Sequence, residues 1–422
     1  MTAVDSGAGV EGRLAALLAS DPDLLADPYP LYAELRERAP VCDLGTVAVV
    51  SRHADVKQVL RDAERLSSRT FVGARTEAAV ARMSDEEREA YRVVATFDAE
   101  IVAHVDGEEH ARMRRIAHRA FTPRRIADMR DSIQRYTDDL LDELEQAGSS
   151  DLRDVAYRLP LLVIAEMLGV PESDLGLVRE WSGPIGRSRG TFAPEPIREA
   201  CEAIDAFRAY VATRVDAARA AADEGRGPDL LATLVDANES ERLTTGELTA
   251  TFVHLLFAGH ETTTNLIAIG MLDLLQRPDE WRVLCDDPNG LAAGAVEELL
   301  RFVSPVQTIN RVAVEDVELA GTTVRAGTAV IGLLGSANRD PHAFERPDEL
   351  DLARAPGAGH LDFGFGPHFC LGAALARLET AVFLTTVATR YPGLRLAADP
   401  STLTWSGSAM LRSPNAVPVA LA

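Results

Sequence analysis

The sequence predicts a mainly α-helical protein with small β-sheets, organised as a single domain over residues 1–422. Most of the chain shows the spacing of apolar residues that is typical of amphipathic helices. Short β-like runs, such as residues 47–50 and 330–333, are few and are separated by turns. No repeat of fixed period and no long Pro-, Gly- or Ser-rich linker divides the chain, which favours one domain. We expect the first 22 residues to be flexible.

The composition indicates a globular protein and excludes several classes of partner. Hydrophobic residues make up 46% of the chain, and the formal net charge is −22. So acidic a protein repels the phosphates of nucleic acids and of anionic membranes. The four cysteines are scattered, which fits a reducing compartment better than a disulfide framework or a zinc ribbon. With no signal-peptide pattern and no run of about 18 apolar residues, we expect a cytoplasmic monomer that binds neither nucleic acid nor membrane.

Two helices are expected to carry functional residues. One opens near Asp106, which is a good N-cap residue followed by acidic residues in the first turn. A long helix opens at Thr244, where Thr244 and Glu247 form a capping-box pattern, and it runs until Pro278 stops it. A helix of that length is normally central and buried.

A glycine-rich segment that ends in a cysteine gives the clearest chemical signal. It reads Phe363-Gly-Phe-Gly-Pro-His368-Phe-Cys370-Leu-Gly372 and is followed at once by a helical pattern. A cysteine at a helix N-terminus lies at the positive end of the helix dipole, which favours its thiolate form. A lone cysteine in such a place would more often be a buried structural residue in a tight turn.

The wider pattern, Phe-x-x-Gly-x-x-x-Cys-x-Gly with a histidine two residues before the cysteine, resembles the haem-binding signature of the cytochrome P450 family. The resemblance implies the single-domain fold of that family, with haem b (iron protoporphyrin IX) between the long central helix and the cysteine loop. It also implies that Cys370 is the metal ligand, that Phe363 packs beside it, that His368 reaches a haem propionate, and that Gly372 belongs to the cofactor-binding loop. Thiolate ligation pushes electron density onto the iron and favours O–O cleavage.

Residues 257–263, Phe-Ala-Gly-His-Glu-Thr-Thr, resemble the dioxygen-binding motif of the same family. Taken alone, this segment could be a kinked core helix whose threonine hydroxyl bonds back to a carbonyl. The resemblance implies that Ala258 and Gly259 leave room for the cofactor and that Thr262 and Glu261 deliver protons. Because a buried carboxylate is costly without a partner or a task, we expect Glu261 to have one.

A third helix, at roughly residues 291–302, contains a Glu-x-x-Arg pattern. Glu298 and Arg301 are three residues apart and would by default form an exposed ion pair of small energetic value. The resemblance implies instead a buried pair that fixes the loop of the cysteine. Glu298 rather than Glu297 is the expected partner, because only Glu298 has the three-residue spacing.

The family usually supplies a third member of this ion pair from a Pro-x-Arg-Phe-like segment. Here that segment reads Pro347-Asp-Glu349-Leu, with glutamate where the arginine is expected. Arg346 or Arg354 could substitute, or the pair could bond to backbone atoms instead.

Haem propionates would bring two negative charges into an acidic protein, so cations must converge on them. His110 and Arg114 are four residues apart on one helix face and resemble the histidine–arginine contact of the family. Arg311, on a strand-like run after Ser304-Pro305, is the third expected cation, and His368 is the fourth. Each of them alone would be read as an ordinary surface charge.

The resemblance implies a haem-thiolate monooxygenase that activates dioxygen to hydroxylate or epoxidise a hydrophobic small molecule. We expect a role in secondary-metabolite biosynthesis, with a polyketide or a modified amino acid as the kind of substrate. Electrons would come from NAD(P)H through a ferredoxin or flavodoxin-type donor and its reductase. The residues expected to line the substrate pocket are Phe71, Val72, Leu255, Val306, Thr308, Met410 and Leu411.

Alternative functions stay open at this point. Within enzymes, the chain could be a peroxygenase or could catalyse an oxidative coupling or rearrangement, although the intact Glu261-Thr262 pair argues against this. Outside enzymes, it could be a non-catalytic haem sensor. A metal-binding protein that uses His360, His368 and Cys370 would be one ligand short of a structural zinc site.

Overall fold

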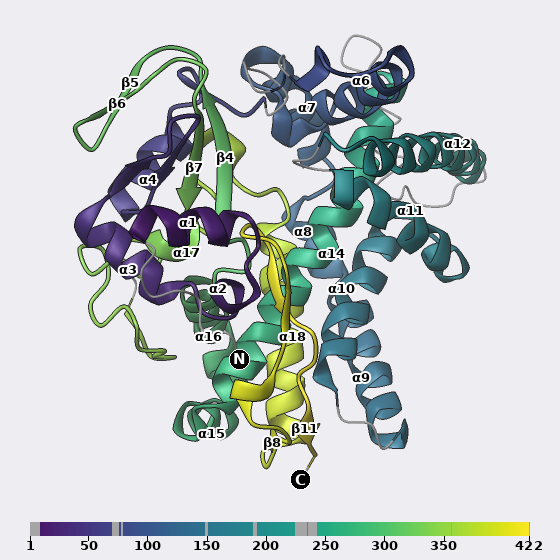
Figure 1. The fold of residues 1–422 in the computed structure, drawn as a ribbon. Coiled ribbons are helices and arrows are strands. Elements are labelled where there is room, and N and C mark those ends of the chain that lie inside the picture. The colour runs from purple at the N-terminus through teal and green to yellow at the C-terminus, as the bar shows by residue number, and fades with distance from the viewer. Residues whose placement is uncertain are drawn as a thin grey trace. The chain divides into compact units, whose positions relative to one another are not determined.

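The computed structural model describes residues 9–69, 76, 79–147, 151–188, 192–223, 234, 243–355 and 357–421. Helices predominate in these residues, with one five-stranded sheet and three two-stranded sheets, which confirms the predicted fold class (Figure 1). The chain divides into two compact units. Unit 1 comprises Met1–Leu66, Ile126–Pro160 and Glu261–Ala422, and unit 2 comprises Ser67–Arg125 and Leu161–His260. The single-domain organisation stays a prediction.

The largest sheet has the strand order β1-β2-β7-β4-β3, and all of its residues except Ser67 at the end of β3 belong to unit 1. Its strands are β1 (Val41–Asp43), β2 (Val47–Val50), β3 (Leu66–Ser67), β4 (Thr308–Ala313) and β7 (Ala329–Leu333). β7 pairs parallel to β2 and antiparallel to β4, and Figure 1 shows β4 and β7 side by side. Val50 and Val330 share a hydrophobic core with Val56 of α4 (His53–Arg61). Both of the predicted β-like runs are therefore strands of one sheet.

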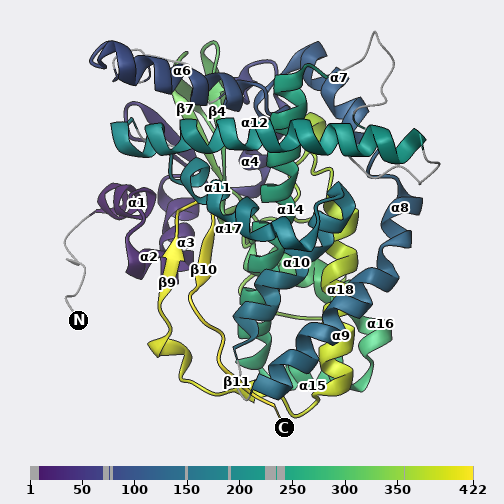
Figure 2. The ribbon, with the colours of Figure 1, turned by 90° about the vertical axis from the view of Figure 1, so that its right-hand side faces the viewer.

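Smaller sheets and most of the helices complete unit 1. The paired strands are β5 (Val317–Leu319) with β6 (Thr322–Val324), β8 (Arg395–Leu396) with β11 (Val419–Ala420), and β9 (Trp405–Gly407) with β10 (Arg412–Pro414). The other helices are α1 (Val10–Leu18), α2 (Pro22–Ala26), α3 (Tyr29–Arg38), α9 (Arg130–Ala147), α15 (Pro278–Asp286), α16 (Pro288–Val303), α17 (Leu334–Ala337) and α18 (Ala373–Arg390), with the 3-10 turns η3 (Gly366–His368) and η4 (Pro400–Thr402). α18 packs against both α16 and α9 (Figure 2).

The beginning of the chain differs from the expectation that its first 22 residues are flexible. Residues 10–18 form α1, and Leu14 and Leu17 of this helix are buried in a hydrophobic core with Leu31 and Leu35 of α3. Burial of two leucines stabilises the helix by several kcal/mol at the usual value of about 1.5–3 kcal/mol for each side chain. The expectation is therefore wrong for α1.

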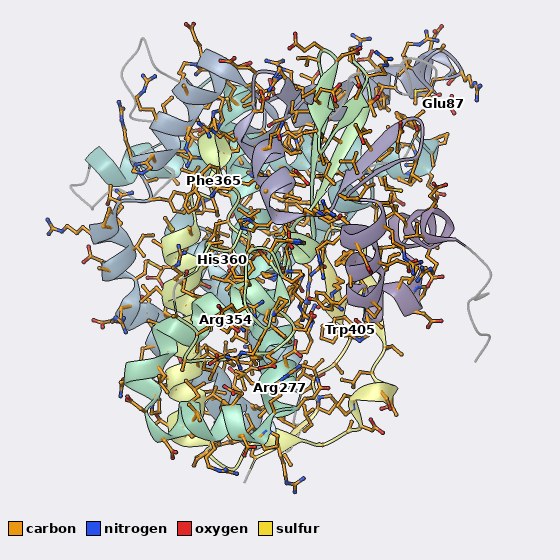
Figure 3. All side chains as sticks on the ribbon, turned by 90° about the vertical axis from the view of Figure 1, so that its left-hand side faces the viewer. Glu87, Arg277, Arg354, His360, Phe365 and Trp405 are labelled. Atoms are coloured by element: carbon orange, nitrogen blue, oxygen red, sulfur yellow. The ribbon has the colours of Figure 1, made fainter. Side chains whose placement is uncertain are left out.

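Arginine and aromatic side chains alternate in a stack within unit 1. The Cζ atom of Arg339 lies 3.4 Å from the ring centroid of Tyr29 and 3.8 Å from that of Phe302. Arg412 lies 5.2 Å from the ring centroid of Tyr29 and 4.5 Å from that of Trp405, which Figure 3 labels. Cation–π contacts of this kind are worth about 0.5–2 kcal/mol each. The stack therefore joins α3, α16 and the β9–β10 hairpin.

Arg412 also fixes the start of the chain. Its guanidinium donates hydrogen bonds to the carbonyl oxygens of Leu25 (2.9 Å) and Ala26 (2.7 Å), at the end of α2. These carbonyls are among those that a helix leaves without an intrahelical donor. Residues separated by 387 positions in the sequence are thereby joined directly.

Unit 2 is helical in the described residues. Its elements are α6 (Asp85–Ala99), η1 (Val102–His104), α7 (Gly107–His118), η2 (Glu172–Asp174), α11 (Leu175–Ser188) and α12 (Pro194–Asp223). α12 packs against both α6 and α11, and the Trp181 ring of α11 meets Phe207 of α12 edge-on. Three helices contain residues of both units, namely α8 (Pro123–Asp128), α10 (Leu152–Leu168) and α14 (Thr245–Leu275). In the part of the chain that the structure describes, no helix is long and apolar enough to cross a membrane.

The predicted helix starts are found, with one difference in their chemistry. At α14, the hydroxyl of Thr244 accepts from the Glu247 amide and the Glu247 carboxylate accepts from the Thr244 amide, so the capping box is confirmed. Asp106 is the N-cap residue of α7, as predicted. Its carboxylate, however, accepts hydrogen bonds from the hydroxyl of Ser67 (2.6 Å) and the amide of Ser68 (3.1 Å). Asp106 therefore fixes the segment that follows β3.

Candidate active site

The loop of Cys370 turns sharply before α18 begins. Gly364 and Gly366 have φ angles of +72° and +76°, a region that side chains disfavour and glycine tolerates. The amide of Cys370 donates a hydrogen bond to the carbonyl oxygen of Phe363 (2.8 Å), which closes the loop on itself. Gly372 is the N-cap residue of α18. The loop thus presents Cys370, which is exposed, just before a helix N-terminus.

The same loop lies against the end of α4. A Cβ atom on Gly366 would lie 3.4 Å from the Cα of Arg61, so the glycine permits the two backbones to approach closely. Phe365, labelled in Figure 3, and Phe369 are 36% and 40% exposed. Large aromatic side chains are usually much more buried than this. Two apolar rings therefore accompany Cys370 at an accessible position of unit 1.

Phe363 is held by a charged network that sequence analysis did not identify. The Cζ atom of Arg377 in α18 lies 4.4 Å from the Phe363 ring centroid. Arg377 donates two hydrogen bonds, of 2.6 and 3.0 Å, to the carboxylate of Glu297, and His360 Nε2 lies 3.3 Å from the same carboxylate (His360 is labelled in Figure 3). Burial alone would raise the pKa of Glu297, but the hydrogen bonds from His360 and Arg377 lower it to about 2. The ring beside the cysteine loop is therefore packed against a permanently ionised pair.

The predicted ion pair of α16 is present and buried. Arg301 donates hydrogen bonds of 2.8 Å from Nε and from Nη2 to the two oxygens of Glu298, and the two side chains are only 3% and 4% exposed. Arg301 also donates to the carbonyl oxygens of Asn338 (3.0 Å) and Pro347 (2.7 Å). These bonds satisfy both charges away from water, as a buried pair requires. The choice of Glu298 as the partner is confirmed.

Arg354 is the third member of this cluster. Its Nε lies 3.0 Å from each oxygen of Glu298, and Figure 3 labels Arg354. Arg346 instead pairs with the carboxylate of Glu349 in an exposed position. The carbonyl oxygen of Glu349 accepts hydrogen bonds from both Arg301 (3.0 Å) and Arg354 (2.8 Å). Two of the alternatives left open by the sequence therefore hold together: Arg354 substitutes, and the pair also bonds to backbone atoms.

Asn338 links the ion-pair helix to the cysteine loop. Its side-chain amide donates to the hydroxyl of Ser304 (2.8 Å), at the end of α16, and its side-chain oxygen accepts from the amide of Leu361 (2.7 Å). Asn338 is fully buried, so both bonds form away from solvent. Sequence analysis missed it, because a single asparagine in a loop carries no periodic signal.

Two of the predicted haem cations belong to unit 1. Arg311 lies on β4, as expected, and it is buried; its guanidinium donates a hydrogen bond to the carbonyl oxygen of Asn310 (2.8 Å). His368 ends the turn η3 and is half-buried. A buried arginine is costly unless something negative or polar accepts its hydrogen bonds. Their contact with a propionate stays a prediction.

The other two predicted cations, His110 and Arg114, lie four residues apart on α7 of unit 2, where His110 is buried and Arg114 half-buried.

Ala258 and Gly259 lie on α14. A Cβ atom on Gly259 would come within 2.9 Å of the side chain of Ile164 in α10. Gly259 therefore permits close packing of α14 against α10, in addition to the role beside the cofactor that the resemblance implies.

Glu261 and Thr262 follow in the same helix. Glu261 is exposed, whereas Thr262 is half-buried. Because Glu261 is exposed, its carboxylate keeps its hydration and does not bear the cost of burial. The proton-delivery role of this pair therefore rests on the resemblance and not on burial.

Two of the segments predicted to line the substrate pocket lie side by side in unit 1. The amide of Gln307 donates a hydrogen bond to the carbonyl oxygen of Met410 (2.8 Å). This bond brings Val306 and Thr308, the neighbours of Gln307, next to the tip of the β9–β10 hairpin, which includes Leu411. Sequence analysis gave Gln307 no role.

The remaining pocket residues are not brought together by an observed contact. Leu255 is buried in the part of α14 that belongs to unit 2. Phe71 and Val72 lie outside the described residues. Among the residues that the structure describes, no group of three or more His, Cys, Asp and Glu side chains is arranged to hold a metal ion, so the zinc alternative has no support there.

Comparison with known proteins points to one family. The family model described as Cytochrome P450 matches residues 190–282 and 291–417. Nocardicin C N-oxygenase of Nocardia uniformis is 41% identical to the chain, over 94% of the chain and 96% of that protein. Cytochrome P450 monooxygenase PikC of Streptomyces venezuelae is 36% identical, over 94% and 92%. The solved structure of the Bacillus subtilis bacillaene polyketide synthase cytochrome P450 PksS superposes with a TM-score of 0.82 and 32% identity, over 95% of the chain and 98% of that structure.

Proposed function

Because the chain belongs to the cytochrome P450 family, we propose that it hydroxylates or epoxidises a hydrophobic small molecule in secondary-metabolite biosynthesis. Family membership makes it an oxidoreductase of the monooxygenase class. The names of its relatives support the finer proposal, since one acts on nocardicin C and another belongs to a polyketide synthase. A polyketide or a modified amino acid is therefore the proposed kind of substrate.

The family implies a haem-thiolate cofactor, and the residues of the cysteine loop fit such a group. The observation that carries the proposal is the exposed Cys370 just before α18, where the helix dipole favours a thiolate. The exposed rings of Phe365 and Phe369 offer apolar surface to a flat macrocycle. We assign the iron to Cys370, with Phe363 and Gly372 shaping the loop around it.

The other cofactor contacts follow from charge and size. The cations of His110, Arg114, Arg311 and His368 would neutralise the propionates, and Ala258 and Gly259 would leave space on α14. When bound, the haem supplies the redox chemistry with dioxygen that side chains cannot perform. The contribution of the chain is to hold the sulfur, to move protons and to exclude water from the substrate.

Thr262 and Glu261 are the residues that we propose move protons. Glu261 is exposed, so its carboxylate exchanges protons directly with water. Thr262 is half-buried and follows it on the helix, so its hydroxyl can accept a proton on one lone pair and donate another. The pair thus provides a route from solvent to a more sheltered position. Exposure of Glu261 suits an acid that regains its proton from water after each turnover.

Rigid support for the sulfur comes from unit 1. The buried cluster of Glu298, Arg301 and Arg354 ties α16 to the segment before the cysteine loop, and Asn338 ties the end of α16 to Leu361. Fixing a metal ligand through neighbouring hydrogen bonds keeps its orientation constant.

The proposed electron donor is a ferredoxin or flavodoxin-type protein with its NAD(P)H-dependent reductase, and the proposed location is the cytoplasm, where NAD(P)H is available.

The absorbance spectrum of the reduced protein with carbon monoxide tests the central assignment. The wild type should show the strongly red-shifted Soret band of thiolate ligation, and Cys370→Ala should lose it. Cys285→Ala, which changes a half-buried cysteine of α15, is the matched control and should keep the band. A band that survives in Cys370→Ala, or that is missing from the wild type, would contradict the proposal. Turnover with hydrogen peroxide but not with NAD(P)H, reductase and ferredoxin would contradict the monooxygenase assignment.

A further inference from the structure

Gln307 closes the end of α16 with its side chain. It is 1% exposed, and its amide nitrogen donates hydrogen bonds to the carbonyl oxygens of Val303 (3.0 Å) and Ser304 (2.6 Å). Ser304 is the C-cap residue, with a φ angle of +46°. Carbonyls at a helix C-terminus have no donor within the helix, so the glutamine supplies the bonds that they need.

The backbone of Gln307 is bonded on both sides as well. Its amide donates to the carbonyl oxygen of Met410 (2.8 Å), and its carbonyl oxygen accepts from the amide of Gly335 in α17 (3.3 Å). A Cβ atom on Gly335 would lie 2.3 Å from Oε1 of Gln307, so a larger residue at position 335 would displace the end of the glutamine side chain. One buried residue therefore fixes three segments that are distant in sequence.

The hairpin tip that Gln307 holds is itself rigid. Gly407 has a φ angle of +109°, and a Cβ atom on it would lie 2.0 Å from the carbonyl oxygen of Leu411. The amide of Ser408 donates to that same carbonyl (2.9 Å), and the Ser408 hydroxyl accepts from the amides of Met410 and Leu411 (both 3.3 Å). Because the tip has little freedom of its own, its distance from β4 is set by the bond between Gln307 and Met410.

We propose that Gln307 is a positioning residue that selects substrates by size. It does so by setting the spacing between Val306 and Thr308 on one side and Met410 and Leu411 on the other. The side chain of Gln307 donates its hydrogen bonds to carbonyl oxygens at the end of α16 and need not touch the substrate. This inference rests on the proposed function, which assigns these four neighbours to the substrate pocket. A shift of one segment relative to the other would change the room for a bulky ligand more than for a small one.

Two azoles of different size, imidazole and 4-phenylimidazole, serve as the probes. Each binds ferric haem through a ring nitrogen and shifts the Soret band, so its Kd is measured by titration without turnover. Gln307→Met keeps the length of the side chain but removes both donated bonds. Gly335→Ala leaves residue 307 unchanged but adds a methyl group that crowds Oε1 of Gln307. It therefore tests the same spacing independently.

We expect both variants to change the Kd of 4-phenylimidazole at least fivefold while the Kd of imidazole stays within twofold. Asn415→Ala is the control, because it removes a hydrogen bond to Thr404 (2.8 Å) at the far end of the same hairpin and should leave both Kd values within twofold. An unchanged ratio of the two Kd values in both variants would overturn the inference, whether each Kd stays constant or both change by the same factor. A wild type without the carbon monoxide band or without any azole shift would instead show that the proposed function has failed.

Discussion

Arg354→Ala tests whether the ion cluster under the cysteine loop is built as described. The change removes the contacts of 3.0 Å from Nε to both oxygens of Glu298 and the bond to the carbonyl of Glu349. Glu298 keeps two bonds from Arg301 and one from the amide of Asp351, so it is not left as an isolated buried charge. The cost should therefore be that of hydrogen bonds to a charged group, about 2–3 kcal/mol.

Two further variants bracket this value. Arg301→Ala leaves the buried carboxylate without its bidentate partner and should cost more, about 3–5 kcal/mol. Arg346→Ala is the matched control, because this arginine lies in the same segment but is exposed, and it should cost at most about 1 kcal/mol. Urea unfolding of the holoprotein, followed by tryptophan fluorescence, gives the free energies from the midpoints. A cost for Arg354→Ala no larger than that of Arg346→Ala would refute the assignment of Arg354 as the third member.

Glu349→Arg in the Arg354→Ala background provides a second check. It restores arginine at the position where the family pattern places one. The side chain of Glu349 is exposed and bonded to Arg346, and only its backbone carbonyl reaches the cluster. The double variant should therefore be no more stable than Arg354→Ala alone. Recovery of most of the lost stability would show that position 349 can still reach Glu298.

Three other outcomes can be measured with the same preparations. Burial raises the pKa of Glu379 well above its usual range, so the native state retains a proton that the unfolded state releases, and stability should fall as pH rises above about 4.5. Burial raises the pKa of Asp362 in the same direction, so Glu379→Gln should reduce this slope in urea midpoints at a series of pH values but not remove it. A slope that the substitution leaves unchanged would contradict the prediction. Gly259→Ala should cost about 1–3 kcal/mol by crowding Ile164, and adding Ile164→Ala should recover part of the loss in thermal unfolding; no recovery would argue against that contact. Asn338→Ala should cost about 1–3 kcal/mol by leaving the buried amide of Leu361 without an acceptor. The variant should lose the thiolate band at a lower urea concentration than the wild type. An identical urea dependence would show that Asn338 does not stabilise the cysteine loop.

Local patterns were sufficient where a short stretch of sequence decides the structure. The capping box of Thr244 and Glu247 predicted the start of α14, because its two hydrogen bonds involve residues only three positions apart. The three-residue spacing likewise identified Glu298 as the partner of Arg301. The N-cap position of Asp106 was also predicted, but its carboxylate bonds to residues 67 and 68, which no local pattern could show.

The supports of the candidate site were not predictable, because they depend on the path of irregular loops. The sequence offered both Arg346 and Arg354 as the third member of the ion cluster but could not choose between them. These residues and Asn338 lie in a long segment without periodicity, where the spacing of residues says nothing about the direction of a side chain. Arg377 looked like an ordinary helix residue until the fold placed it between Phe363 and Glu297. The exposure of Glu261 was likewise not predictable, because its apolar sequence neighbours do not say which face of the helix it lies on.

The bonds from Arg412 to Leu25 and Ala26 cannot form until synthesis of the chain is nearly complete. At about 5–20 residues per second, a ribosome needs roughly 20–80 s to pass from residue 25 to residue 412. During that interval α2 lacks the two bonds from Arg412, and Tyr29 lacks the guanidinium of Arg412 on its ring and, until residue 339 is made, that of Arg339 as well. α2 and α3 therefore obtain these contacts only late in synthesis, after the β9–β10 hairpin has been made.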